Sequence, residues 1–216
     1  MRTTERLDKL EAWLQKELCE GRRMKAPAPD LDVAKVIHKE PSVFIGYAPR
    51  RADATGFTEA DPFSTAPSIT VMPVPGMVKY VEEQRFDRFK NVHRTQDMGQ
   101  QLNVQMLFAV YEDGVRLPGF AESAEKGEMD MSLIMEGTRD GLYTLLNWMD
   151  DCKSALLGVK YIPGTDMYVD IPTLTYGLYS DQNYMADKRP LFYGLMEARF
   201  ICHADEALNP DVEELL

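Results

Sequence analysis

The sequence has few of the residue types on which several protein classes depend. Its 216 residues include only three cysteines, Cys19, Cys152 and Cys202, which are far apart and fit no metal-binding spacing. We therefore expect small buried thiols in a reducing compartment rather than a disulfide framework. No apolar run approaches the roughly 20 residues that span a bilayer, and the N-terminal stretch lacks the apolar centre of a signal peptide. These absences predict a soluble cytoplasmic protein without membrane contacts.

Positive charge is also scarce. The 24 Lys and Arg residues are outnumbered by 35 Asp and Glu residues, so the formal net charge is −11. Such a chain repels polyanions at long range and is a poor candidate for wrapping nucleic acid. The hydrophobic fraction of 44% and the charged fraction of 27% are ordinary for a globular protein, which excludes a disordered chain.

Motifs that position reactive groups are absent. The sequence contains no Walker loop, no G-x-G-x-x-G fingerprint, no G-x-S-x-G elbow, and neither H-E-x-x-H nor C-x-x-C. None of the three histidines lies beside a plausible carboxylate pair at helical spacing. We therefore predict that the protein is not an enzyme and has no catalytic residues, no cofactor and no metal site.

Two juxtapositions of reactive residues have simpler structural explanations. Cys202 and His203 are neighbours, but adjacent residues of a strand point to opposite faces. A core cysteine followed by a surface histidine is therefore favoured over a thiol nucleophile with its base. Asp150 and Asp151 would need ligands from other segments to hold Mg²⁺, so a solvated helix face is favoured there.

Two segments have the apolar spacing of amphipathic helices. The first begins at Thr3 or Thr4, either of which can cap it, carries leucines at helical spacing, and ends at Gly21. The second runs from about Asp140 to Leu157 with a wide apolar stripe, and Thr138 is its expected N-cap.

The rest of the pattern is mostly β. After a proline-containing linker at 22–29, short strands are expected at 33–38 and 43–47, and further strands at 168–171, 174–179 and 191–202. Residues 68–74 and 77–86 are expected to form a hairpin that turns at Pro75-Gly76, with Pro73 at a sheet edge or a strand end. Residues 102–111 are apolar on both faces, which predicts a central strand covered on both faces.

These elements predict an α+β fold, with an antiparallel or mixed β-sheet flanked by an N-terminal helix and one long central helix. Residues 1–202 are expected to form a single domain. Residues 48–67 and 113–137 are expected to be long irregular loop insertions, which usually carry function. Residues 203–216 contain five acids and no Lys or Arg, and are predicted to be an acidic tail.

Basic residues gather in three places and are the candidate protein-interface residues. They are Arg85, Arg88, Lys90 and Arg94 before the central strand, Arg50 and Arg51 in the first long loop, and Lys188 and Arg189 before the last strand. Acids such as Asp87 and Asp97 are interleaved with the largest cluster. A contact with another protein is therefore favoured over nucleic-acid recognition.

Three stretches carry a family resemblance. They are the N-terminal helix leading into SVFIGYA and SITVMPVPG, the helix GLYTLLNWMDDCKSALLG between strands, and the closing segment NYMADKRPLFYGLMEARFIC. By this arrangement, over roughly residues 4–202, the chain resembles the tail terminator (tail completion) proteins of long-tailed bacteriophages and related contractile tail-like particles. Family members are often shorter, and the excess here lies in residues 48–67, 113–137 and 203–216.

The resemblance implies a sheet flanked by helices that assembles as a homo-oligomeric ring, typically a hexamer, on the head-proximal end of the tail tube. The ring ends tube polymerisation and joins the tube protein to neck or connector proteins, and to the sheath protein where the tail contracts. DNA passes through the lumen only as cargo. The protein would be a virion component of the tail or neck, assembled in the host cytoplasm. A ring also needs a heterologous interface, in which one face of a subunit meets a different face of its neighbour.

Two alternatives stay open. Within the same class, the chain fits another neck or connector component, or a tube subunit that forms long stacks instead of discrete rings. From a different class, it fits a small cytoplasmic enzyme or ligand-binding domain whose site lies in the long loops and matches no motif.

Overall fold

The computed structural model describes eight segments of the chain. They are residues 1–27, 36–46, 65–87, 92–112, 131–159, 161–181, 184–185 and 191–202. Most of the first predicted loop (48–64), residues 113–130 of the second, and the acidic residues 203–216 lie outside the described residues.

The predicted N-terminal helix is confirmed. Helix α1 spans Thr3–Leu14 and continues through a π-helical turn, η1, at Gln15–Cys19. At its start, the Glu5 carboxylate accepts a hydrogen bond of 2.9 Å from the Arg2 backbone N–H, so Arg2 and not a threonine occupies the N-cap position. After its end, Gly21 adopts a φ of 73°, a conformation that favours glycine.

The main sheet is mixed, which confirms the predicted α+β class. In spatial order its strands are β3 (Ser42–Ile45), β4 (Ser68–Asp87), β5 (Val92–Tyr111), β10 (Leu191–Cys202) and β6 (Met167–Val169), with β7 (Thr175–Leu178) also paired to β10. β3 and β4 are parallel, and the other pairs in the sheet are antiparallel. Smaller elements are the pair β1 (Met24–Pro27) and β2 (Val36–Lys39), the pair β8 (Ser180–Asp181) and β9 (Tyr184–Met185), and the 3₁₀ helix η4 (Ile171–Thr173).

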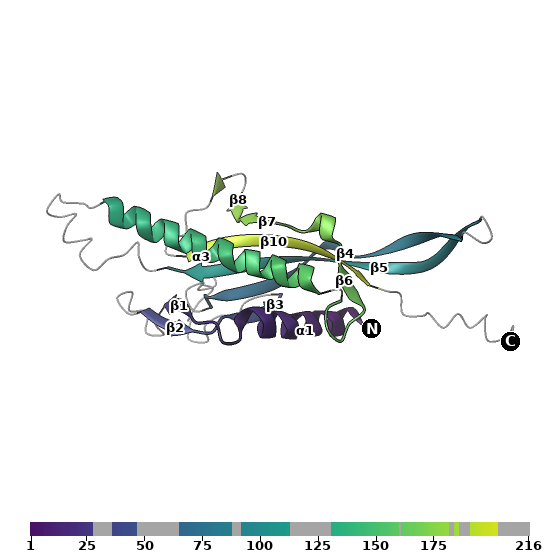
Figure 1. The fold of residues 1–216 in the computed structure, drawn as a ribbon, viewed down its shortest axis with the longest axis horizontal. Helices are drawn as coiled ribbons and strands as arrows, with labels where there is room; N and C mark the ends of the chain where they lie inside the picture. Colours follow the sequence, from purple (N-terminus) through teal and green to yellow (C-terminus); the bar gives the residue numbers. More distant parts are fainter. Residues whose placement is uncertain are drawn as a thin grey trace, which may run out of the picture.

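Helix α1 and the long helix α3 (Met131–Gly158) pack into one hydrophobic core with one face of this sheet (Figure 1). Trp148 of α3 is fully buried and meets Phe108 of β5 edge-on, with ring centroids 5.3 Å apart. Its indole N–H donates a hydrogen bond of 3.2 Å to the carbonyl oxygen of Leu18. This bond ties the end of the first helix to the middle of α3.

Strand β5 is central, as predicted, but its two faces are covered unequally. Every second residue from Leu102 to Val110 is buried against the helices. On the opposite face Ala109 and Tyr111 are buried, whereas Leu107 is only half-buried. The prediction of complete cover on both faces is therefore confirmed at one end of the strand and wrong further along it.

The predicted turn at Pro75-Gly76 is wrong. β4 is one strand of 20 residues that runs through both positions, and the hairpin connects Asp87 to Val92 instead. A register shift between Pro73 and Val78 accommodates the prolines, because residues in a bulge need not donate to the ladder. Pro73 also lies beyond Val71, the last residue that pairs with β3.

Two other predictions fail locally. The predicted linker at 22–29 contains β1, whose Ala26 is fully buried. Residues 131–137, predicted to be irregular, belong to α3, so Thr138 lies inside the helix and is not its cap. The helix also passes through Gly141, where a Cβ atom would lie 2.2 Å from the Phe192 ring. Glycine there reflects close packing and is not a stop signal.

The remaining predicted strands are confirmed with shifted ends. β2, β3, β6 and β7 overlap the predicted segments, and β10 has the predicted bounds Leu191–Cys202. Ile171, predicted at the end of a strand, begins η4 instead.

Candidate functional site

The two longest strands continue beyond the sheet as a two-stranded ribbon, which we call the arm (residues 81–87 and 92–99). β10 pairs with β5 only as far as Gln100, and β3 pairs with β4 only as far as Val71. Farther out, the β4–β5 ladder is the only strand pairing in the described residues, and it continues to the pair Asp87–Val92. Figure 1 shows the arm extending past α1 and past the end of β10.

A bulge in β4 lies three residue pairs before the start of the arm. Pro73 pairs with Val104 and Val78 pairs with Leu102, so β4 has three more residues than β5 in this interval. A bulge bends the strand that contains it and increases the local twist. The Pro75-Gly76 segment, which resembles a turn signal, therefore lies in a bulge close to the root of the arm.

The arm contains part of the largest predicted basic cluster. Arg85 and Arg94 are direct cross-strand partners in the β4–β5 register. Paired residues of an antiparallel ribbon carry their Cβ atoms on the same face, about 4.5–5.5 Å apart, and like charges in this arrangement are destabilising.

The structure does not test the other predicted interface residues. Arg88 and Lys90 lie outside the described residues, as do Arg50, Arg51, Lys188 and Arg189. By sequence, residues 85–94 contain four basic residues and one acid, a formal charge of +3, whereas the whole chain carries −11. Residues 85–94 are therefore a basic segment of an acidic protein.

A partly buried ion pair lies at the root of the arm. Arg6, only 2% exposed, donates hydrogen bonds to both carboxylate oxygens of Asp166, at 2.9 and 2.5 Å. It also donates to the side-chain oxygen of Gln100, the last residue of β5 that pairs with β10. Burial by itself raises the pKa of Asp166, but the hydrogen bonds and charge of Arg6 outweigh it and the pKa is lowered.

Sequence reasoning missed this arginine, although a signal for its burial exists. Arg6 precedes Leu10 by four residues and Trp13 by seven, the spacing of the apolar face of α1. A charged residue on that face needs a partner. The partner, Asp166, is 160 residues away and no local pattern identifies it.

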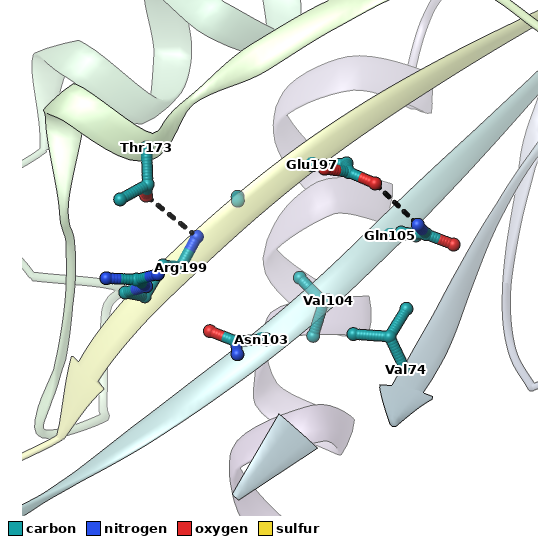
Figure 2. A pocket seen from close by; sticks show the side chains of 8 residues that line it. Val74, Asn103, Val104, Gln105, Thr173, Glu197 and Arg199 are labelled. Atoms are coloured by element: carbon teal, nitrogen blue, oxygen red, sulfur yellow. Dashed lines mark hydrogen bonds between the residues drawn. The ribbon is translucent and has the colours of Figure 1, made fainter. Parts of the chain in front are cut away.

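A pocket of about 190 Å³ lies beside the bulge (Figure 2). Its lining residues are Val74 of β4, Asn103, Val104 and Gln105 of β5, Glu197, Ala198 and Arg199 of β10, and Thr173 of η4. The Gln105 side-chain N–H donates to the Glu197 carboxylate at 2.5 Å, and the Arg199 backbone N–H donates to the Thr173 hydroxyl at 3.3 Å. Both bonds are visible in Figure 2.

Arg199 is the charged group of this pocket with the least complete pairing. Its Nη1 atom is 3.7 Å from a carboxylate oxygen of Asp170. Its Nε atom is buried and makes no hydrogen bond within the part of the chain that the structure describes. With charges of both signs and several donors, the pocket is suited to hold a small polar group.

The cysteines lie in the core, as predicted. All three are buried free thiols in the structure. Burial raises the pKa of Cys19 to about 12 and that of Cys202 to about 11, and it raises the pKa of Cys152 as well. These thiols are protonated near neutral pH, which argues against nucleophilic activity. His203 lies outside the described residues.

The two predicted helix-surface acids are exposed but have partners. Asp151 forms an ion pair with Arg22, and the Tyr176 hydroxyl donates a hydrogen bond to Asp150. Within the described segments, no group of three or more His, Cys, Asp or Glu side chains is placed to hold a metal ion. No helix among the described residues is long and apolar enough to cross a membrane.

Comparisons with known proteins leave the family open. The sequence matches no protein-family model, and no curated protein matches it.

Proposed function

We propose that this protein is a structural subunit that assembles into a ring on the head-proximal end of a phage tail tube, or of a related tail-like particle. In this role it ends tube polymerisation and joins the tube to neck proteins, and to the sheath in a contractile tail. The proposal combines the resemblance of the sequence to tail terminator proteins with an observed feature of the fold, the arm.

The arm is the observation that carries the proposal. A two-stranded ribbon without a third strand or a packed helix is at best marginally stable in water. Among the described residues no further strand pairs with the edges of the arm, and open strand edges attract other strands. An arm with these properties, held firmly at its root by Arg6 and Gln100, suits a contact with another protein.

The charge distribution favours another copy of the same chain as that protein. The segment 85–94 has a formal charge of +3 on a chain of −11, so the rest of the subunit carries −14. A basic arm that meets an acidic surface elsewhere on an identical subunit makes a heterologous contact, and such contacts close into rings when the rotation permits.

The test compares the assembly states of the full chain and an arm variant by mass photometry and negative-stain electron microscopy. We expect discrete rings, with a mass of about 148 kDa for six copies of 24.6 kDa. In the variant Arg85→Glu/Arg94→Glu we expect the ring population to fall at least tenfold, because the arm no longer complements an acidic surface.

A matched control reverses two exposed arginines outside the arm. Arg23 and Arg139 are both exposed, and the variant Arg23→Glu/Arg139→Glu changes the net charge by the same amount. Rings that persist in the control and disappear in the arm variant support the proposal. A chain that stays monomeric at all accessible concentrations contradicts it, and long stacks indicate a tube subunit.

The pocket beside the bulge favours one second candidate, a ligand-binding domain. Its polar lining, with the buried Nε of Arg199, is suited to a small polar ligand. A monomeric mass together with a ligand-dependent rise in Tm would support this candidate, because a ligand that binds only the native state stabilises it by mass action.

A further inference from the structure

The end strand of the main sheet, β3, has an inner and an outer edge. Among the described residues β4 is the only strand that pairs with β3. On the inner edge, the Ser42 backbone N–H donates a hydrogen bond of 3.3 Å to the Pro67 carbonyl oxygen. The backbone groups of successive residues in a strand point to opposite edges. The carbonyl group of Pro41 and the N–H group of Val43 therefore point to the outer edge, away from β4.

The side chain of Gln15 binds both of these outward groups. Its amide N–H donates to the Pro41 carbonyl oxygen at 3.1 Å, and its amide oxygen accepts a hydrogen bond of 2.9 Å from the Val43 backbone N–H. In a parallel ladder, a strand residue donates to and accepts from the two residues that flank its partner. The Gln15 amide therefore makes the two bonds that a parallel strand residue opposite Ser42 would make.

The pair of bonds requires an amide side chain. Glutamine carries a donor and an acceptor on one planar group, whereas an ionised glutamate only accepts, and lysine and arginine only donate. Asparagine has the same amide group but is shorter by one methylene. Glutamine at position 15 is therefore matched to this edge both in chemistry and in length.

The end of the first helix holds Gln15 in place. The preceding residue, Leu14, is fully buried in the core, and Gln15 itself is half-buried as the first residue of η1. The Glu20 N–H donates to the Gln15 carbonyl oxygen at 3.0 Å, the i→i+5 bond of a π turn. Such turns are rare and occur frequently at functional sites. The backbone of Gln15 is thus fixed, and its side chain reaches β3.

Strand β3 has little protection of its own against pairing with another chain. Unpaired N–H and C=O groups at a sheet edge are a template for a further strand, and charged side chains or covering elements are the usual defence. The sequence of β3, Ser-Val-Phe-Ile, has no charge and a high β-propensity. A second copy carries the same edge, and two such edges can pair about a two-fold axis in a self-complementary contact.

We infer that Gln15 covers the outer edge of β3 and thereby prevents this strand from pairing with β3 of a second copy. Without the glutamine amide, the sheets of two copies join edge to edge. This inference does not depend on the proposed function, because it concerns an edge that does not include the arm.

Hydrogen–deuterium exchange and mass photometry of the full chain test the inference. The variant Gln15→Met keeps the length of the side chain and a good helix former but removes both hydrogen bonds. In dilute solution we expect peptides that contain residues 42–46 to exchange about fivefold faster than in the wild type, as the loss of one hydrogen bond implies. At higher concentration we expect association beyond the wild-type state, with exchange in these peptides slowed again.

Three further variants separate an uncovered edge from a weakened helix end. Lys16→Met places the same apolar side chain on an exposed neighbour and should keep the wild-type assembly state. Gln15→Asn, whose amide is too short to make both bonds, should associate as Gln15→Met does, and it replaces that variant if Gln15→Met does not fold. Gln15→Glu also loses the bond to Pro41 but places a charge at the edge, and it should not associate.

Three outcomes would overturn the inference. The first is a wild-type assembly state for Gln15→Met and Gln15→Asn at every accessible concentration, which would make Gln15 a purely structural residue. The second is association without slower exchange at residues 42–46, since another surface would then join the copies. The third is equal association of Gln15→Glu, because the cause would then be the altered helix end and not the open edge.

Discussion

Arg6, in the first turns of α1, donates hydrogen bonds to both carboxylate oxygens of Asp166, which precedes β6. The same guanidinium bonds to Gln100 at the root of the arm. One buried side chain therefore joins the N-terminal helix, the loop before the edge strand β6 and the point where β5 leaves the sheet. Because the three segments are far apart in the sequence, this pairing forms only when the whole fold is assembled.

Asp166→Asn should destabilise the protein strongly. The substitution leaves Arg6, whose side chain is 3% exposed, without its anionic partner, while Asp166 itself is 23% exposed. Removing one member of a fully buried pair costs about 3–5 kcal/mol, and the partial exposure of Asp166 reduces this to about 2–3 kcal/mol. Urea denaturation measures the change in the free energy of unfolding.

The exposed pair Arg22–Asp151 provides the control for this experiment. Their side chains are 34% and 51% exposed. Asp151→Asn should therefore cost less than about 1 kcal/mol. Equal costs for the two variants would show that the Arg6–Asp166 pair contributes no more than a surface ion pair.

The stability that this pair contributes should depend on pH in acid. In the folded protein the pKa of Asp166 is lower than its ordinary value of 3.8. The unfolded state therefore binds a proton more readily than the native state. The contribution is therefore fully present above about pH 4 and is lost as the pH falls through the lowered pKa. Urea titrations of the wild type and Asp166→Asn should differ most at pH 6 and converge below pH 4. A difference that grows as the pH falls would contradict this assignment.

The sequence predicted those parts of the fold that depend on local periodicity. Alternating apolar residues located β10 from Leu191 to Cys202, and the apolar stripe located most of α3. Both patterns are strong because one face of each element contacts the core. The central position of β5 also followed from its composition, since only a central strand buries so many apolar residues.

The candidate site could be predicted only in part, because it depends on register. A turn at Pro75-Gly76 would pair the residues before it with those after it. In the observed register a bulge lies there instead, and the connection between Asp87 and Val92 brings Arg85 opposite Arg94. A proline and a glycine are typical of tight turns and of bulges alike, and tertiary pairing with β5 decides between them. The basic cluster was therefore visible in the sequence, but the location of Arg85 and Arg94 on a projecting ribbon was not.

Gly194→Ala should overpack the interface between β10 and α3. A Cβ atom at this position would lie 2.4 Å from Met149 Sδ and 3.3 Å from the carbonyl oxygen of Gly177. Since Met149 is fully buried, it has little room to move, and we expect a loss of about 1–3 kcal/mol in the free energy of unfolding. Guanidinium denaturation measures the loss.

Two further variants test whether the clash with Met149 is the cause. Gly177→Ala meets no atom within 4 Å, so it should change stability by less than about 0.5 kcal/mol. Met149→Ala creates a cavity, but combined with Gly194→Ala its cost should be less than the sum of the two single costs, because the cavity accepts the new methyl group. Strict additivity would show that the glycine is needed for another reason.

The three thiols should be unreactive until the protein opens. Burial raises the pKa of Cys202 to about 11 and that of Cys19 to about 12, so at pH 8 fewer than about one in a thousand of these groups is a thiolate. We expect no reaction with Ellman's reagent in the native state over an hour, and three thiols per chain in 6 M guanidinium. Because the open population is set by the free energy of unfolding, Asp166→Asn should react faster than the wild type, and Asp151→Asn should not. Rapid labelling of the native wild type would show that a cysteine is accessible without unfolding, and would contradict the buried positions of all three.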